Sequence, residues 1–330
     1  MPELLAFVLL LAITAYSTAG GVDFGAGIWD LLAGTGPQGR EARALIDHSM
    51  APVWEVNNVW LVLAIVLSWT AFPTLFQAAF GSLYPLFTLA LIGLVLRGAF
   101  FAFRHVADNP RAHRVADVVF GISSVVTPFF FAASLGAIAS GRVGEGALSA
   151  SFGPMAIAFG VVSVAATAFS GASFLVGDAR RYQAQRMVAY FRRRVLISGL
   201  VLIAAGTAAL VVVWTQAPSL LVSALHGPGL FFALVTMTLV PVVIYLTWSG
   251  VFRWFRVLTV AAIGSMVLAW GFAQSPYLLP GKLTIEQAIA PRGTQVVLLG
   301  VTIALIVVIL PAMGLLYYLD QRNTLEAPES

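Results

Sequence analysis

The chain has 330 residues and a net charge of +4; 60% of the residues are apolar and only 10% are charged. A soluble domain carries about 25% charged residues, so a chain this poor in charge cannot cover its surface with polar groups and is solvated by lipid. The absence of cysteine excludes disulfides, thiolate metal sites, iron–sulfur clusters and cysteine nucleophiles.

The apolar residues form repeated runs that are long enough to cross a bilayer, which takes about 17–25 residues of helix. The runs are continuous rather than alternating, which indicates helices and not a barrel. The first run is not a signal peptide, because Glu3 stands where a positive region is required and the run is too long. We predict an all-α polytopic membrane protein with one membrane domain, 1–330, and nine transmembrane helices at about 4–28, 54–77, 82–104, 117–139, 153–177, 195–216, 229–249, 253–273 and 295–319.

The basic residues predict the orientation of these helices. With the N-terminus outside, the cytoplasmic loops hold 14 basic residues and the outer loops hold three. The positive-inside rule therefore predicts an outer N-terminus and a cytoplasmic C-terminus. Because this asymmetry accounts for the positive charge, we expect no nucleic-acid partner. The most basic stretch, QRMVAYFRRR at 185–194, could attract anionic lipid headgroups, but we favour an orientation signal.

Three ionisable residues fall inside the predicted helices: Asp23, Glu55 and Arg97. Each costs about 2.5–3.5 kcal/mol at the membrane centre on insertion scales, so each needs a reason to be there. The predicted topology places all three in the cytoplasmic half of three consecutive helices. They form either a proton-accessible acidic site with its countercharge or an ion pair that fixes helix register. Asp30 lies closer to an interface and is less informative.

The surroundings of the two acids are unusual for simple lipid anchoring. Asp23 lies in GVDFGAG, whose Gly21 and Gly25 form a GxxxG pattern that predicts close helix packing but does not explain the aspartate. Glu55 lies in PVWEVNNVW, where the amides of Asn57 and Asn58 can hydrogen-bond across helices or hold water.

The histidines argue against a redox centre in this chain. The four histidines are His48, His105, His113 and His226. All of them fall in loops or at the ends of predicted helices, and no two share a helix face at the spacing of metal ligands. A bis-histidine haem and a histidine-rich metal centre are therefore not expected. The sequence also holds no glycine-rich nucleotide loop and no nucleophile with a base nearby.

Five motifs follow one another along the chain: GVDFGAG, PVWEVNNVWLV, the AFP ending at Pro73, LVLRGAFFAFR and SPYLLPGKLT. Their sequences and their order resemble subunit II of the cytochrome bd quinol oxidases. The resemblance covers the whole chain. It implies two four-helix bundles plus one helix, paired with a subunit I in the inner (cytoplasmic) membrane of a prokaryotic cell. Possible further partners are small single-helix subunits and membrane lipid.

The resemblance also implies an activity and a division of labour. Subunit I would carry the b-type and d-type haems and the quinol site, and this chain would hold no cofactor. The complex would oxidise quinol and reduce dioxygen to water, generating proton motive force without pumping. The family's acid in W-[DE]-x-N maps onto Glu55 and is associated with a cytoplasmic proton route, while Asp23 and Arg97 match a family aspartate and arginine. Glu286 in IEQAIAP is a weak match to a later acidic motif.

Two other classes of function stay open at this point. One is a proton-coupled secondary transporter that uses Asp23, Glu55 and Arg97 as its coupling site. The other is a purely structural membrane subunit without a proton role. Transporters usually have broken helices in corresponding positions of two halves, which the predicted polar group in one half does not match.

Overall fold

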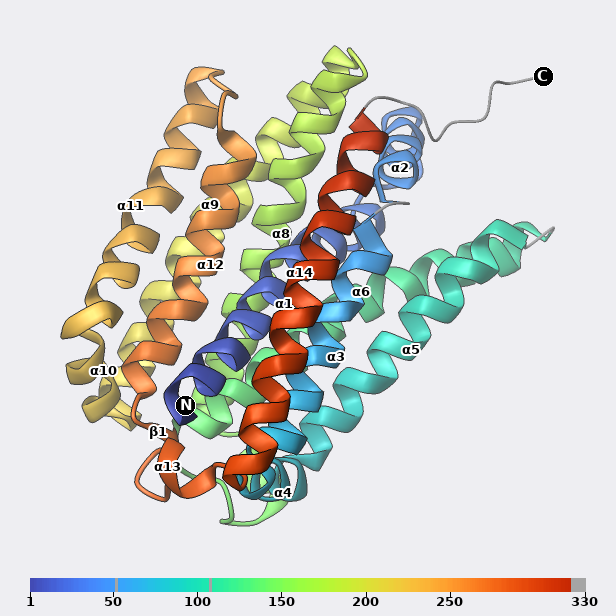
Figure 1. Ribbon diagram of the computed structural model, residues 1–330. Helices are drawn as coiled ribbons and strands as arrows, with labels where there is room; N and C mark the ends of the chain where they lie inside the picture. The colour runs from blue at the N-terminus through green and yellow to red at the C-terminus, as the bar shows by residue number, and fades with distance from the viewer. Residues whose placement is uncertain (51–52, 107–108, 322–330) are drawn as a thin grey trace.

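The computed structural model describes residues 1–50, 53–106 and 109–321, with the backbone alone at 50, 53–56, 105–106, 110, 309–310, 313 and 316–321. Apart from one short hairpin, the regular structure of this part is helical (Figure 1). The elements are α1 (Pro2–Leu31), α2 (Pro37–Met50), α3 (Val53–Ala71), α4 (Pro73–Ser82), α5 (Tyr84–Val106), α6 (Pro110–Ala139), α7 (Ala147–Ser151), α8 (Pro154–Arg181), α9 (Gln185–Gln216), α10 (Pro218–Ala224), α11 (Gly227–Ser249), α12 (Phe255–Gln274), β1 (Tyr277–Leu279), β2 (Leu283–Thr284), α13 (Ile285–Ala288) and α14 (Arg292–Gln321).

Within the described residues, seven helices are long and apolar enough to cross a membrane: α1, α5, α6, α8, α9, α11 and α12. Their outer faces carry large apolar side chains, such as Val95, which is 68% exposed, and Trp248, which is 67% exposed. Water would not solvate such faces, so the protein is a multi-pass membrane protein. The N-terminus and the end of α14 lie at opposite ends of the helix bundle (Figure 1). The count of nine spans and the orientation stay predictions.

The second predicted span, 54–77, is wrong as one continuous helix. The chain breaks at Phe72, where φ is −130°, and α3 and α4 meet at a bend of 114°. The cause is Pro73, because a proline ring clashes with the preceding residue in the helical conformation and pushes it into the extended region. At most the bent pair of α3 and α4 forms one broken span.

Other boundaries also differ from the prediction. Helix α9 begins at Gln185, ten residues before the predicted start at 195, and α6 begins at Pro110 rather than at 117. Hydropathy marks only the apolar part of a helix, whereas the hydrogen-bonded helix continues through the polar headgroup region. The last predicted span falls in α14, whose described apolar part is Arg292–Val308.

The long helices pack in two sets. In the first set α3 and α6 pack on α1, and α5 packs on α6; in the second set α8 and α11 each pack on α9 and α12. The two sets meet where α8 packs on α1 and α6 and where α12 packs on α1. Helix α14 lies against α3 and α1. The amphipathic helix α2 folds back over the end of α1 and α8, at the end of the bundle opposite the N-terminus (Figure 1).

Gly25 makes the close crossing of α1 and α8 possible. A Cβ atom at this position would overlap the backbone oxygen of Thr167 and lie 2.8 Å from the Cα atom of Gly171. Both contacts are backbone atoms that cannot move aside, so Gly25 of the GxxxG pattern acts in close packing, whereas a Cβ atom at Gly21 would make only an ordinary contact with Ser170 at 3.6 Å. Trp29 reinforces the same crossing by donating its Nε1 hydrogen to the Ala168 carbonyl at 2.7 Å.

We expect Gly25→Ala to destabilise the protein by about 1–3 kcal/mol, because overpacking forces the two helices apart. The midpoint of thermal unfolding of the purified protein measures this effect. Gly206→Ala in α9 is the matched control, since a Cβ atom there meets open space. Equal midpoints for the two variants would contradict the close crossing.

Candidate functional site

A buried ion pair joins α1 and α5. Arg97 Nη2 donates to Asp23 Oδ1 at 2.7 Å and to the Asp23 carbonyl at 3.1 Å, and the two side chains are only 1% and 2% exposed. Arg97 Nη1 donates to the Ser124 hydroxyl on α6, which in turn donates to the Phe120 carbonyl at 2.7 Å. The structure thus brings together two of the three predicted ionisable residues.

Aromatic rings and a glycine complete this site. The guanidinium carbon of Arg97 lies 4.9 Å from the ring centre of Phe24 and 4.4 Å from that of Phe120. A Cβ atom at Gly27 would overlap the Ser124 hydroxyl and lie 2.8 Å from Arg97 Nη1. The second part of GVDFGAG therefore serves the polar site, where only a glycine leaves room for the guanidinium.

Several polar atoms near the pair are buried without a hydrogen-bond partner among the described residues: Arg97 Nε, Tyr16 Oη and Asn57 Oδ1. Asn57 on α3 lies against Gly20, where a Cβ atom would be 3.0 Å from its amide nitrogen. Gly20 is one turn before Asp23, so the start of α3 adjoins the ion pair. Buried polar atoms of this kind are usually satisfied by ordered water.

Glu55, the third predicted residue, belongs to the first turn of α3, but its side chain lies outside the described residues. Its backbone is two residues before Asn57 on the same helix. Its role therefore stays a prediction, and the geometry of the pair rests on Asp23 and Arg97 alone.

A second ion pair repeats the first one two helical turns further along. Arg104 Nη1 donates to Asp30 Oδ2 at 3.2 Å, and Asp30 is only 1% exposed. Arg43 of α2 contacts the other oxygen of Asp30 at 3.4 Å, and Arg104 also pairs with Asp47 of α2, whose side chain is 43% exposed. Asp30 lies in the last turn of α1, but α2 folds over it and excludes solvent, so it is more informative than the sequence indicated.

The spacing of these residues was a signal in the sequence that the prediction missed. Asp23 and Asp30 are seven residues apart on α1, and Arg97 and Arg104 are seven residues apart on α5. Seven residues are close to two helical turns, so each set lies on one face. The Phe120 ring lies between the two guanidinium groups, with centre distances of 4.4 and 5.0 Å.

The second set of helices holds an ion pair that the sequence did not single out. Arg256 Nη2 of α12 donates to Asp178 Oδ1 of α8 at 2.5 Å and to the Phe174 carbonyl at 3.1 Å. Gly177 leaves space for this guanidinium, since a Cβ atom there would lie 2.6 Å from Arg256 Nη2. The pair lies close to the C-terminal end of α8 and ties α12 to it.

The three histidines whose side chains the structure describes lie in polar or helix-end positions. His48 packs its ring against Tyr182, His113 lies 3.8 Å from the Asp117 carboxylate one turn along α6, and the His226 ring contacts the Val222 carbonyl at the start of α11. The side chain of His105 lies outside the described residues. In the described part of the chain no three acidic or histidine side chains gather as a metal site.

An apolar groove of about 720 Å³ is lined by residues of both sets of helices, among them α1, α3, α6, α8, α9, α11 and α12. Phe131 and Pro128 of the PFFF stretch line it, together with Phe7, Leu10 and Trp270. Tyr16 also lines the groove, and its ring meets Phe131 edge-on at 5.8 Å. The aromatic stretch of α6 thus faces a groove, whereas Phe120 packs inside the core.

Comparisons of sequence show what the chain is similar to. The family model described as cytochrome bd terminal oxidase subunit II matches residues 1–320. Cytochrome bd-I ubiquinol oxidase subunit 2 of Escherichia coli (strain K12) is 30% identical over 182 residues, which are 52% of this chain and 46% of that protein. Cytochrome bd ubiquinol oxidase subunit 2 of Bacillus subtilis (strain 168) is 32% identical over 109 residues, 33% of this chain and 31% of that protein. The chain matches about half, or less, of the length of these relatives.

A solved structure is similar over the whole chain. A chain in the structure of bd oxidase from Geobacillus thermodenitrificans superposes with a TM-score of 0.75 and 22% sequence identity, covering 98% of this chain and 99% of that chain. At this level of identity the similarity concerns the fold.

Proposed function

Because the chain belongs to the cytochrome bd terminal oxidase subunit II family, we propose that it is the second subunit of a quinol oxidase in the inner membrane of a prokaryotic cell. The complex oxidises quinol, reduces dioxygen to water and generates a proton motive force without pumping. The observation that carries this proposal is the family match over residues 1–320, and the similarity in fold to a bd oxidase chain supports it.

The haems and the quinol site belong to the partner, subunit I, and this chain is its scaffold. The positions of His48, His113 and His226 at helix ends support this division, because a haem in the membrane interior needs an axial ligand there. The exposed apolar faces of the long helices supply surfaces that can pack against a partner or lipid.

A cytoplasmic proton route is the second role of this chain. Reduction of dioxygen to water consumes one proton per electron, and drawing these protons from inside while quinol protons leave outside makes the reaction electrogenic. The ion pairs support such a route, since carboxylates follow one another from the exposed Asp47 to the buried Asp30 and then to Asp23. Asp23 and Asp30 are separated by seven residues, about 10 Å of helix, so water must bridge them.

The unpartnered polar atoms beside the inner pair suit such water molecules. Tyr16 Oη, Asn57 Oδ1 and Arg97 Nε each lack a partner in the described part of the chain. Glu55, at the start of the helix that carries Asn57, is the carboxylate proposed to pass the proton on. Arg97 holds the Asp23 carboxylate in place through its hydrogen bonds, so it is a positioning residue rather than a carrier of protons.

A proton-coupled transporter is less well supported. Transporters usually place broken helices in corresponding positions of two halves. Among the described helices the bent pair of α3 and α4 has no counterpart in the second set, and the Asp178–Arg256 pair lies near the end of α8.

A visible spectrum of the purified native complex tests the proposed function. We expect a d-type haem band in the complex and no stoichiometric haem in this chain expressed without its partner, because its histidines lie at helix ends. A complex without a d-type haem band would overturn the oxidase proposal. A stoichiometric haem absorbance in the isolated chain would overturn only the assignment of all haems to subunit I.

A further inference from the structure

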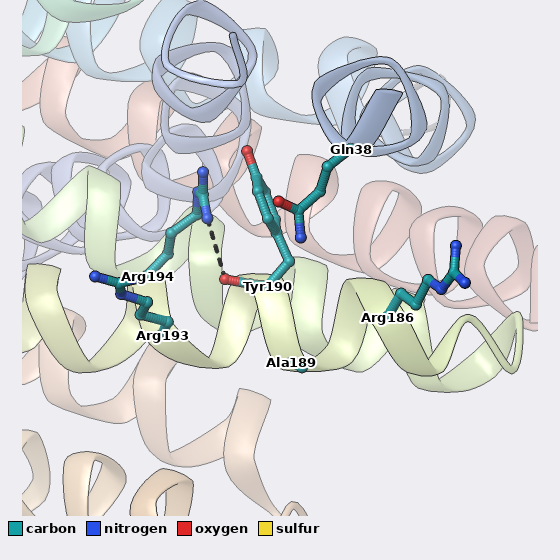
Figure 2. A pocket seen from close by; sticks show the side chains of 6 residues that line it. All are labelled: Gln38, Arg186, Ala189, Tyr190, Arg193 and Arg194. Carbon is teal, nitrogen blue, oxygen red and sulfur yellow. Dashed lines mark hydrogen bonds between the residues drawn. The ribbon is translucent and has the colours of Figure 1, made fainter. Parts of the chain in front are cut away.

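A basic cavity of about 330 Å³ lies between α2 and the first turns of α9 (Figure 2). Three arginines and no acidic residue are among the residues that line it. The lining residues are Gln38, Arg186, Ala189, Tyr190, Arg193 and Arg194. It is separate from the ion pairs of α1 and α5 and has no part in the proposed proton route.

The positive charge in this cavity is uncompensated. Arg186 and Arg193 are exposed, and neither forms an ion pair with a described residue. Arg192, on another face of α9, instead donates to the Trp248 carbonyl at 2.5 Å. Arg186 and Arg193 are two turns apart on one face of α9 and line opposite ends of the cavity, on either side of Tyr190 (Figure 2), so they give it positive charge at both ends.

Two buried donors border the cavity beside these arginines, on Tyr190 and Arg194. Tyr190 is only 8% exposed, and its hydroxyl is buried without a partner among the described residues. Arg194 donates through Nη1 to the Tyr190 carbonyl at 3.2 Å, but its Nε is also buried and unpartnered. In Figure 2 the Tyr190 ring stands between Arg194 and the Gln38 amide. Buried donors without partners point to an acceptor that fills the cavity.

The helix that carries the cavity also indicates the kind of anion. Helix α9 has 32 residues and is therefore about 48 Å long, whereas the hydrocarbon core of a bilayer is about 30 Å thick. The arginines of its first turns thus reach the level of the headgroups. The same face continues with exposed aliphatic side chains four, seven and eight residues after Arg193: Ile197, Leu200 and Val201.

We propose that this cavity binds the phosphate headgroup of an anionic phospholipid, whose acyl chains lie along the aliphatic face of α9. A soluble phosphate would meet the same guanidinium groups, but it would gain no binding energy from the apolar residues of the aliphatic face of α9. Under the predicted orientation the lipid belongs to the cytoplasmic leaflet, where anionic lipids attract basic residues.

The test compares lipid retention by two charge-matched variants of the purified complex. Arg186→Gln/Arg193→Gln removes two charges from the cavity, and Arg111→Gln/Arg114→Gln removes two exposed charges from α6, away from it. Each complex is delipidated, and native mass spectrometry then measures its binding of phosphatidylglycerol and of phosphatidylcholine with the same acyl chains. Inorganic phosphate is added as a competitor, and the mass of the intact complex in the same spectra checks that both variants are assembled.

We expect the wild type and the α6 variant to prefer phosphatidylglycerol, and the cavity variant to bind it about thirtyfold more weakly, since each basic residue near an anionic surface contributes roughly fivefold. Equal binding by the two variants would overturn the proposal. Displacement of phosphatidylglycerol by equimolar inorganic phosphate would overturn the lipid assignment in favour of a soluble phosphate. These readouts do not depend on haem or turnover, so they are independent of the oxidase proposal.

Discussion

Glu55→Gln is expected to slow quinol-driven oxygen uptake about a hundredfold or more at unchanged d-type haem content. Glutamine keeps the size and the hydrogen-bonding capacity of glutamate, so the packing of α3 survives. It cannot exchange a proton near neutral pH, so a relay through this side chain stops. Oxygen uptake normalised to d-type haem measures the effect.

Two further variants distinguish a relay from a structural role. Glu55→Asp keeps the carboxylate, and water can span the lost methylene, so we expect substantial activity. Glu41→Gln makes the same chemical change at an exposed position of α2 and should leave turnover unchanged. Full activity in Glu55→Gln would eliminate the relay. The opposite ranking, with glutamine tolerated and aspartate impaired, would assign Glu55 a structural role.

Arg97→Ala is expected to abolish most of the assembled complex. The substitution leaves the Asp23 carboxylate buried at 2% exposure without its countercharge, and breaking a buried pair costs about 3–5 kcal/mol. A loss of that size is comparable to the whole stability of many proteins. The yield of complex, recovered through a tag on subunit I and quantified by its haem, measures the effect.

Two further variants, one at an exposed arginine and one at the partner of Arg97, are the controls for this prediction. Arg40→Ala removes an exposed arginine and should leave the yield unchanged. Asp23→Asn combined with Arg97→Ala should recover part of the yield, because no uncompensated charge remains. Equal yields for Arg97→Ala and Glu55→Gln would show that the pairing of Asp23 with Arg97 contributes little to assembly.

The candidate site was partly visible in the sequence because charge is so rare in this chain. An aspartate between glycines and an arginine in an apolar run both demand a partner, and Asp23 and Arg97 are indeed paired at 2.7 Å. Ser124 was not visible in the same way, because a hydroxyl inside a helix can satisfy itself on the preceding turn. Only the contact with Arg97 distinguishes it from other serines of the spans.

The sequence by itself determined that this protein lies in a membrane, where its long helices run, and that Asp23 and Arg97 need a reason to be buried. Hydropathy is a local property, and the cost of a charge in lipid is large wherever the charge lies. The tertiary structure alone decided which charges meet. Asp30 is buried because α2 folds back over it, and the basic cavity exists because Gln38 of that helix lies beside α9. Such contacts depend on how each helix is rotated and where each connection returns, which no local pattern records.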